Sequence, residues 1–115
     1  MIIQTERLKE FLGCDDDFLI QLMKKFIEES GEGLAVLKSS CAEGNWPLAK
    51  SAAHKLLSST RIFQLEELSD KLEQIEIMAG ERTNTEQIPS KVIVAEKIWG
   101  NIIEEINGLL KKIPT

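Results

Sequence analysis

Residues 50–63 read KSAAHKLLSSTRIF, and the single histidine of the chain, His54, lies inside this stretch. Successive residues of an α-helix are rotated by about 100°, so a helix here gathers its apolar and small residues on one side. These residues are Ala49, Ala52, Ala53, Leu56, Thr60 and Phe63. His54 then lies roughly 145° from the middle of that side, on a face that solvent reaches. Such a histidine is either an idle surface residue or a nucleophile presented to a partner.

The outer face of the same helix is expected to surround His54 with small residues and cations. Its members are Pro47, Lys50, Ser51, Leu57, Ser58 and Arg61. Lys50 lies one helical turn from His54, and Arg61 lies two turns away. Leu57 has two interpretations: it belongs to an apolar docking patch around His54, or it packs on a neighbouring helix.

Apolar residues spaced three and four positions apart predict helices in the rest of the chain. A short helix is expected from Thr5 to Leu12, with Thr5 as its N-cap and Gly13 as the residue that ends it. A long helix is expected to start at the acidic cluster 15–17 and to end at Gly44. Its apolar positions are Leu19, Leu22, Met23, Phe26, Ile27, Leu34, Leu37 and Cys41.

Asn45 and Pro47 favour the start of the third helix, which is expected to end near Ile62. The fourth helix has apolar positions at Leu65, Leu68, Leu72, Ile75 and Ala79. The polar segment 80–89 is expected to form a loop, and the last helix is expected to begin near Ser90. The apolar positions of that helix are Val92, Ala95, Trp99, Ile102, Ile106, Leu109 and Ile113.

Four long amphipathic helices with short connections predict an all-α fold. The expected architecture is an antiparallel up-down-up-down four-helix bundle, with the short extra N-terminal helix at one end. Gly31 and Gly33 interrupt the second helix and mark either a bend or a close approach to another helix. With 115 residues, the chain 1–115 is expected to form a single domain.

The composition narrows the classes of function. A formal net charge of -5 argues against nucleic-acid binding, which needs a basic surface. No apolar run approaches the ~20 residues of a membrane span, and the first residues lack a signal-peptide pattern, so we expect a cytoplasmic protein that binds no membrane. Cys14 and Cys41 fit no metal-binding spacing, and with one histidine no metal site is expected. Cys41 is expected to pack among apolar residues.

The segment 53–60, AHKLLSST, followed by Leu65 and Leu68, resembles the signature of histidine phosphotransfer (HPt) domains. That signature runs roughly A-H-x-L-K-G-S-S, then a Gly and a Leu further along the chain. The long upstream helix and the helix after Leu68 are also similar to those of the family, so the resemblance covers about residues 8–80. It implies a four-helix bundle whose exposed histidine, here His54, accepts a phosphoryl group.

Several positions depart from the family pattern. The usual Lys three residues after the histidine is Leu57 here, the usual Gly after it is Ser58, and the Gly between the two helices is Gln64. In the family, that Lys is thought to help hold the phosphoryl group, and the first Gly leaves room beside the imidazole.

Other residues are candidates for the missing functions. Lys50, Lys55 or Arg61 is expected to supply the positive charge, and Ser58 is still small and able to donate a hydrogen bond. Glu76 falls where some family members have Gln; a carboxylate there would repel a phosphoryl group but is able to orient an imidazole. The candidate partner-binding and phosphoryl-binding residues are Lys50, Ser51, Lys55, Leu57, Ser58, Arg61 and Glu76.

The resemblance implies a phosphoryl carrier rather than an enzyme with a pocket. The donor would be the phospho-aspartate of one response-regulator receiver domain, and the acceptor the aspartate of another. The carrier would need no cofactor of its own, because the receiver supplies Mg²⁺. A hybrid sensor histidine kinase is a further expected partner, and the chain is expected to be a monomer. One alternative is an HPt-like interaction module that binds a receiver or kinase without being phosphorylated; another is a helical adaptor unrelated to phosphorelays.

Overall fold

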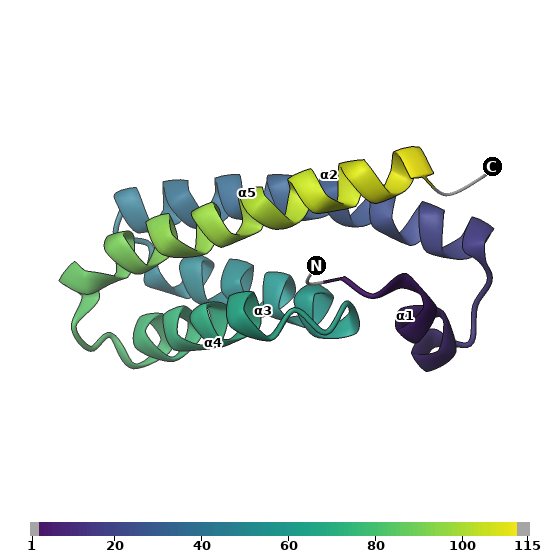
Figure 1. Ribbon diagram of the computed structural model, residues 1–115. Helices are drawn as coiled ribbons and strands as arrows, with labels where there is room; N and C mark the ends of the chain where they lie inside the picture. The colour runs from purple at the N-terminus through teal and green to yellow at the C-terminus, as the bar shows by residue number, and fades with distance from the viewer. Residues whose placement is uncertain (1–2, 113–115) are drawn as a thin grey trace.

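The structure is a computed structural model that describes residues 3–112, and within this range it is helical and contains no strand (Figure 1). The helices, in chain order, are α1 (Thr5–Leu12), α2 (Asp16–Ala42), α3 (Trp46–Ile62), α4 (Glu66–Glu81), the short 3₁₀ helix η1 (Thr85–Gln87) and α5 (Ile88–Lys112). The prediction of an all-α fold is confirmed.

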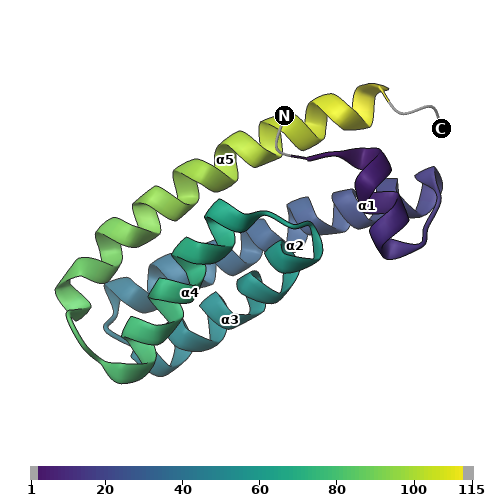
Figure 2. The ribbon, with the colours of Figure 1, turned by 60° about the horizontal axis from the view of Figure 1, so that its bottom comes forward.

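The four long helices enclose one apolar core. α2 packs against α3 and α5, and α4 also packs against α3 and α5, so the core lies between two pairs of helices (Figures 1 and 2). α1 lies at one end of this arrangement, as expected (Figure 2). The buried apolar residues of the long helices include Leu19, Met23, Phe26, Leu34, Leu37, Cys41, Leu56, Leu68, Leu72, Ile75, Val92, Ala95, Ile102 and Ile106.

The predicted apolar positions are therefore confirmed as core positions, with small differences. Leu22, Ile27 and Trp99 are partly buried at the edge of the core. Cys41 packs in the core as expected, and burial raises the pKa of its thiol. Ile113 lies outside the described residues.

The helix ends show why the chain folds in these segments. Asp15 Oδ1 accepts a hydrogen bond from the amide of Phe18 at the start of α2, at 2.9 Å. Asn45 Oδ1 accepts one from the amide of Leu48 at the start of α3, at 3.2 Å. Both side chains satisfy an amide that the helix itself leaves without a partner. Gly13 and Gly44 have φ of 64° and 68°, the left-handed conformation that ends a helix.

The predicted bounds of α1 are confirmed, but the predicted N-cap of this helix and the predicted extent of the loop over 80–89 were wrong. Thr5 is the first residue of α1, and the N-cap is Gln4, whose backbone carbonyl accepts from the amide of Leu8 at 2.9 Å. The expected loop over 80–89 is also shorter: α4 continues to Glu81, and α5 already begins at Ile88. The side chain of Ile88 is fully buried and fixes this end of α5 in the core, and a Pro in the first turn, here at 89, is tolerated by a helix.

Gly33 marks a close approach between α2 and α3 rather than a break, because α2 is continuous through it. A Cβ atom added to Gly33 would lie 2.9 Å from Leu56 Cδ2, closer than packed atoms come. Gly31 faces α5 instead, where an added Cβ would lie 3.7 Å from Trp99, at an ordinary contact distance. The glycine at position 33 therefore lets α3, which carries His54, lie close against α2.

Candidate functional site

His54 stands on the outer face of α3, and 64% of its side chain is exposed. The residues on either side of it in the chain show why. Ala53 is fully buried against the core, while Lys55 is exposed. The prediction that His54 faces solvent is confirmed; its chemical role stays a prediction.

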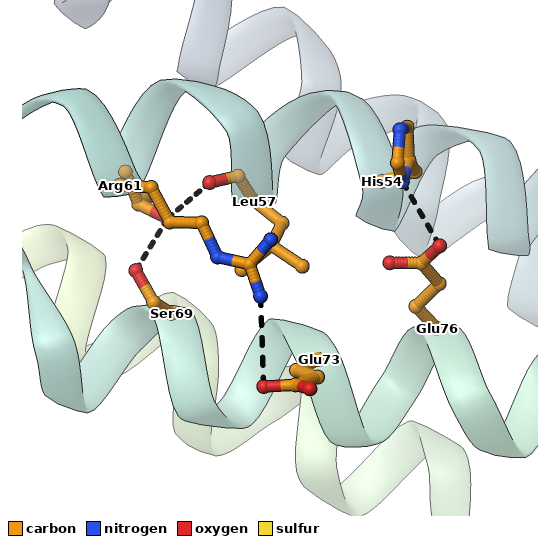
Figure 3. Close-up of polar contacts among 7 residues, drawn as sticks. His54, Leu57, Arg61, Ser69, Glu73 and Glu76 are labelled. Carbon is orange, nitrogen blue, oxygen red and sulfur yellow. Dashed lines mark hydrogen bonds and ion pairs between the residues drawn. The ribbon is translucent and has the colours of Figure 1, made fainter.

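One nitrogen of the His54 ring is held by a carboxylate from α4. His54 Nδ1 lies 2.9 Å from Glu76 Oε2, and Figure 3 shows the other ring nitrogen directed away from Glu76. The Glu76 side chain is 20% exposed, far less than that of His54. Within residues 3–112, no hydrogen bond involves His54 Nε2. The imidazole therefore has one fixed nitrogen and one nitrogen presented to solvent.

Lys50 approaches the same site from one helical turn before His54. The Lys50 stem lies across Gly80 on α4: a Cβ added to Gly80 would come within 3.2 Å of Lys50 Cδ. Lys50 and Lys55 are both exposed, and neither forms an ion pair with another residue of the described chain. Two ammonium groups near His54 are thus available to an anionic group or an acidic partner.

Arg61 is engaged differently from the two lysines. Its Nη2 atom lies 3.7 Å from Glu73 Oε2 on α4, about one helical turn before Glu76 (Figure 3). A shallow groove between α3 and α4 is lined by Lys50, His54, Arg61, Glu73 and Glu76 together with apolar and small residues. Cations from α3 and carboxylates from α4 therefore face one another along it.

Leu57 lines this groove but forms no exposed patch, so of its two interpretations the packing on a neighbouring helix is confirmed and the membership of an exposed apolar patch is wrong. Only 2% of the residue is exposed, and Figure 3 shows its side chain directed toward α4. Leu57 lies at the boundary of the two faces of α3, and α4 covers that boundary. Which neighbour covers a boundary residue depends on how the helices pack, which the helical periodicity alone does not determine.

The serines of the outer face differ in their hydrogen bonds. Ser58 Oγ donates to the backbone carbonyl of His54 at 3.1 Å, as hydroxyls in helices often do. Ser51 is exposed, and its hydroxyl makes no hydrogen bond within the described chain. Both are small, so they leave the space beside the imidazole open.

An apolar depression on the opposite side of His54 was missed by the sequence interpretation. It lies between α2 and α3, and its apolar lining includes Gly33, Val36, Leu48 and Leu56. Val36 is 41% exposed and Leu48 42% exposed; other large apolar residues exposed among residues 3–112 are Phe11, Phe18, Ile62, Ile77, Ile93 and Val94. The sequence did carry one signal for exposed apolar residues here, because Val36 and Leu48 both lie outside the apolar stripe of their helix.

Residues 3–112 contain neither a metal site nor a membrane-spanning helix. No group of His, Cys, Asp and Glu in this range is arranged to hold a metal ion. None of the helices in the same range combines the length and the apolar character that crossing a membrane requires.

Comparisons with known proteins identify the family. Neither the curated proteins nor the solved structures gave a significant match. The family model for the Hpt domain matches residues 21–111, which include α3, α4, and the His54 and Glu76 side chains between them. Because this match covers most of the chain, the protein belongs to the Hpt domain family.

Proposed function

We propose that this protein is a phosphoryl carrier, in which His54 accepts a phosphoryl group from one receiver domain and passes it to another. The observation that best supports this proposal is the exposed imidazole of His54, whose Nε2 atom has no hydrogen-bond partner within residues 3–112. Hpt domains are phosphotransfer modules of two-component systems, and this supports the assignment. The carrier would be built on an antiparallel up-down-up-down bundle of α2, α3, α4 and α5, with α1 outside it.

The proposed reaction needs little machinery on this chain. A ring nitrogen of His54 attacks the phosphorus of a receiver's aspartyl phosphate; the N–P bond forms, the P–O bond to the aspartate breaks, and the carboxylate leaves. The second transfer is the same exchange in reverse, onto the aspartate of another receiver. Phosphoryl transfer depends mainly on alignment and on charge stabilisation, and the receiver would supply Mg²⁺. This chain contributes an accessible nucleophile.

The surface around His54 is suited to a short-lived contact with such a partner. Lys50 and Lys55 place free positive charge beside the histidine on a chain whose formal net charge is -5. Local charge of this kind speeds the encounter with an acidic site. Val36 and Leu48 offer exposed apolar area on the other side of His54, in place of Leu57. Receivers and a hybrid sensor histidine kinase are the partners we propose, with the protein acting as a cytoplasmic monomer.

The test is phosphoryl uptake from a panel of phosphorylated receiver domains in the presence of Mg²⁺, with wild type beside His54→Gln. We expect an acid-labile, base-stable label on wild type and none on the variant, whose circular dichroism spectrum should match that of wild type. Receiver binding without label on either protein would instead establish the interaction module. Equal labelling of both proteins would show that the assignment of His54 is wrong.

A further inference from the structure

Arg61 and Lys50 lie on opposite sides of His54 along α3, and their side chains extend in different directions relative to it. In an α-helix the Cα–Cβ bonds tilt toward the N-terminus, so a long side chain covers the turn before its own residue. Arg61 follows His54 and leans toward it, whereas Lys50 precedes His54 and leans away. Figure 3 shows the Arg61 side chain extending along α3 in the direction of Leu57 and His54. The Lys50 stem instead lies against Gly80, near the end of α4. Of these two cations, Arg61 is the one directed toward the histidine.

The surface of α3 between Arg61 and His54 is low and open. The two residues are seven positions apart, which places them about 10 Å apart along the helix axis and about 20° apart around it. Leu57, between them, is only 2% exposed and lines the same groove. Ser58 is small, and its hydroxyl is turned back to the carbonyl of His54 at 3.1 Å. Neither side chain blocks a guanidinium that reaches toward the histidine.

We propose that Arg61 is a catalytic residue of this carrier: its guanidinium leaves Glu73 and binds the phosphoryl group while this group is transferred to and from His54. The proposal rests on the function proposed above. A phosphoryl group in transfer spreads negative charge over its three equatorial oxygens. The planar guanidinium donates two parallel hydrogen bonds to such oxygens, which the ammonium group of lysine cannot do with the same geometry.

The resting partner of Arg61 is held loosely enough to be exchanged. Arg61 Nη2 lies 3.7 Å from Glu73 Oε2, beyond the roughly 2.7–3.2 Å of an N–H···O hydrogen bond. The two side chains are 58% and 51% exposed, and ion pairs in such contact with water contribute little free energy. A phosphoryl group carries more negative charge than one carboxylate and therefore competes well for the guanidinium. Glu73 thus keeps Arg61 in the groove until the phosphoryl group arrives.

Arg61 contributes charge to the transfer and takes part in none of the bonds that change. The N–P bond to His54 forms and the bond from phosphorus to the donor breaks; the guanidinium keeps its protons and binds the oxygens of the group between them. A preorganised cation at this point stabilises the transition state directly. A cation that only attracts an acidic receiver would have no such effect on a donor that lacks a docking surface. A small donor therefore isolates the contribution of Arg61.

The first measurement is the rate of phosphorylation by phosphoramidate, which needs no partner protein. The N–P bond to His54 forms while the P–N bond of phosphoramidate breaks, and the nitrogen of the donor, already protonated, leaves as ammonia. We expect Arg61→Gln to react about fivefold more slowly than wild type and Arg61→Lys about twofold more slowly. Lys97→Gln, which removes one positive charge outside the groove, should react at the wild-type rate. Matching circular dichroism spectra show that the variants are folded.

Glu73→Gln tests whether the exchange of partners limits the reaction. With its carboxylate replaced by a neutral amide, Glu73 no longer holds the guanidinium, and phosphorylation should become about twofold faster. The same change made in Arg61→Gln should give a smaller gain, because no guanidinium remains to be released. Equal gains in both backgrounds would show that Glu73 acts only through its charge, and would contradict the exchange.

The second measurement follows the guanidinium itself by NMR of the chain labelled with ¹⁵N-arginine. The arginines of the chain are Arg7, Arg61 and Arg82, and the Arg61 signal is identified by its loss in Arg61→Lys. On phosphorylation we expect the Arg61 Nε signal to shift and its proton to exchange with water more slowly, while the other two signals stay in place. His54→Gln should show no such change when phosphoramidate is added. An arginine with a merely structural role would not respond to the phosphoryl group.

The outcomes separate this proposal from the carrier function. Equal rates in wild type and Arg61→Gln, or an Arg61 signal that does not move, would overturn the role of Arg61 and leave the carrier function intact. A larger loss in Lys50→Gln than in Arg61→Gln would assign the phosphoryl contact to Lys50 and would also overturn it. Absence of phosphorylation of wild type by phosphoramidate and by every receiver would overturn the carrier function, and the role of Arg61 with it.

Discussion

Thr60 and Ser69 share a hydrogen bond of 2.8 Å in the buried interface between α3 and α4. Thr60 Oγ1 also donates to the carbonyl of Leu57 at 3.1 Å, so its single proton is used there and the Ser69 hydroxyl is the donor between the helices. Figure 3 shows Ser69 on the helix that also carries Glu76, so this hydrogen bond joins the same pair of helices as the contact between His54 and Glu76. The two hydroxyls therefore fix α3 against α4, on which the geometry of the site depends.

Replacing Thr60 by valine removes the acceptor for Ser69 while keeping the shape of the side chain. A buried hydroxyl without a partner costs about 1–3 kcal/mol, so Thr60→Val should lower the free energy of unfolding by that amount. Urea denaturation followed by circular dichroism measures it. Thr60→Val with Ser69→Ala should cost less than the sum of the two single changes. Strictly additive effects would show that the two hydroxyls do not interact.

Gly33 and Gly31 should respond in opposite ways to alanine. Alanine at position 33 would force Leu56 to move and should destabilise the protein by about 1–2 kcal/mol, as overpacking does. Alanine at position 31 meets Trp99 at an ordinary distance, and it should stabilise α2 by up to about 1 kcal/mol, through helix propensity. The same denaturation experiment ranks the two variants. A Gly33→Ala protein as stable as Gly31→Ala would contradict the close approach of α2 and α3.

Gln64, in the turn between α3 and α4, has a φ of 57°, a left-handed conformation that costs a residue with a side chain about 1 kcal/mol or more. Gln64→Gly should therefore raise the free energy of unfolding by about 1 kcal/mol. The outcome is read from the midpoint of thermal or urea unfolding. Gln64→Ala is the control, since alanine lacks the conformational freedom of glycine and should not stabilise the turn. Equal midpoints for wild type and the glycine variant would show that the turn carries no strain.

Lys50 should affect the rate of phosphoryl uptake without being essential for it. Lys50→Gln removes one free positive charge beside His54, so we expect uptake from a receiver to slow by about two- to fivefold at low salt. The difference should shrink as salt is added, because salt screens exposed charges. Lys97→Gln, an exposed lysine of α5 outside the groove, is the matched control. An equal loss in both variants would mean that only net charge matters.

Local patterns in the sequence were enough to locate the core and most helix ends. The stripe from Leu68 to Ala79 and the caps at Asp15 and Asn45 depend on residues within a few positions of each other, so periodicity and side-chain chemistry predict them. Thr5 shows the limit of this rule: it is the first residue of the helix and not its N-cap, which is Gln4 and makes no capping hydrogen bond through its side chain.

The surroundings of His54 depend instead on how the helices pack. Leu57 was assigned to the exposed face, but α4 covers it, and Val36 and Leu48 are exposed beside His54 although nothing local marks them as neighbours. The contact with Glu76 joins residues 22 positions apart. The resemblance predicted Glu76 as a candidate site residue. The packing of α4 against α3 places its carboxylate 2.9 Å from His54 Nδ1.

The most direct test of the carrier function follows a phosphoryl group through both transfers. Wild type is labelled by a phosphorylated receiver, purified from that donor, and mixed with a second, unphosphorylated receiver and Mg²⁺. We expect the label to be base-stable, to be absent from His54→Gln, and to move to the second receiver as it leaves this protein. Label that is acid-stable, or that appears equally on His54→Gln, would contradict the proposal that His54 carries the phosphoryl group.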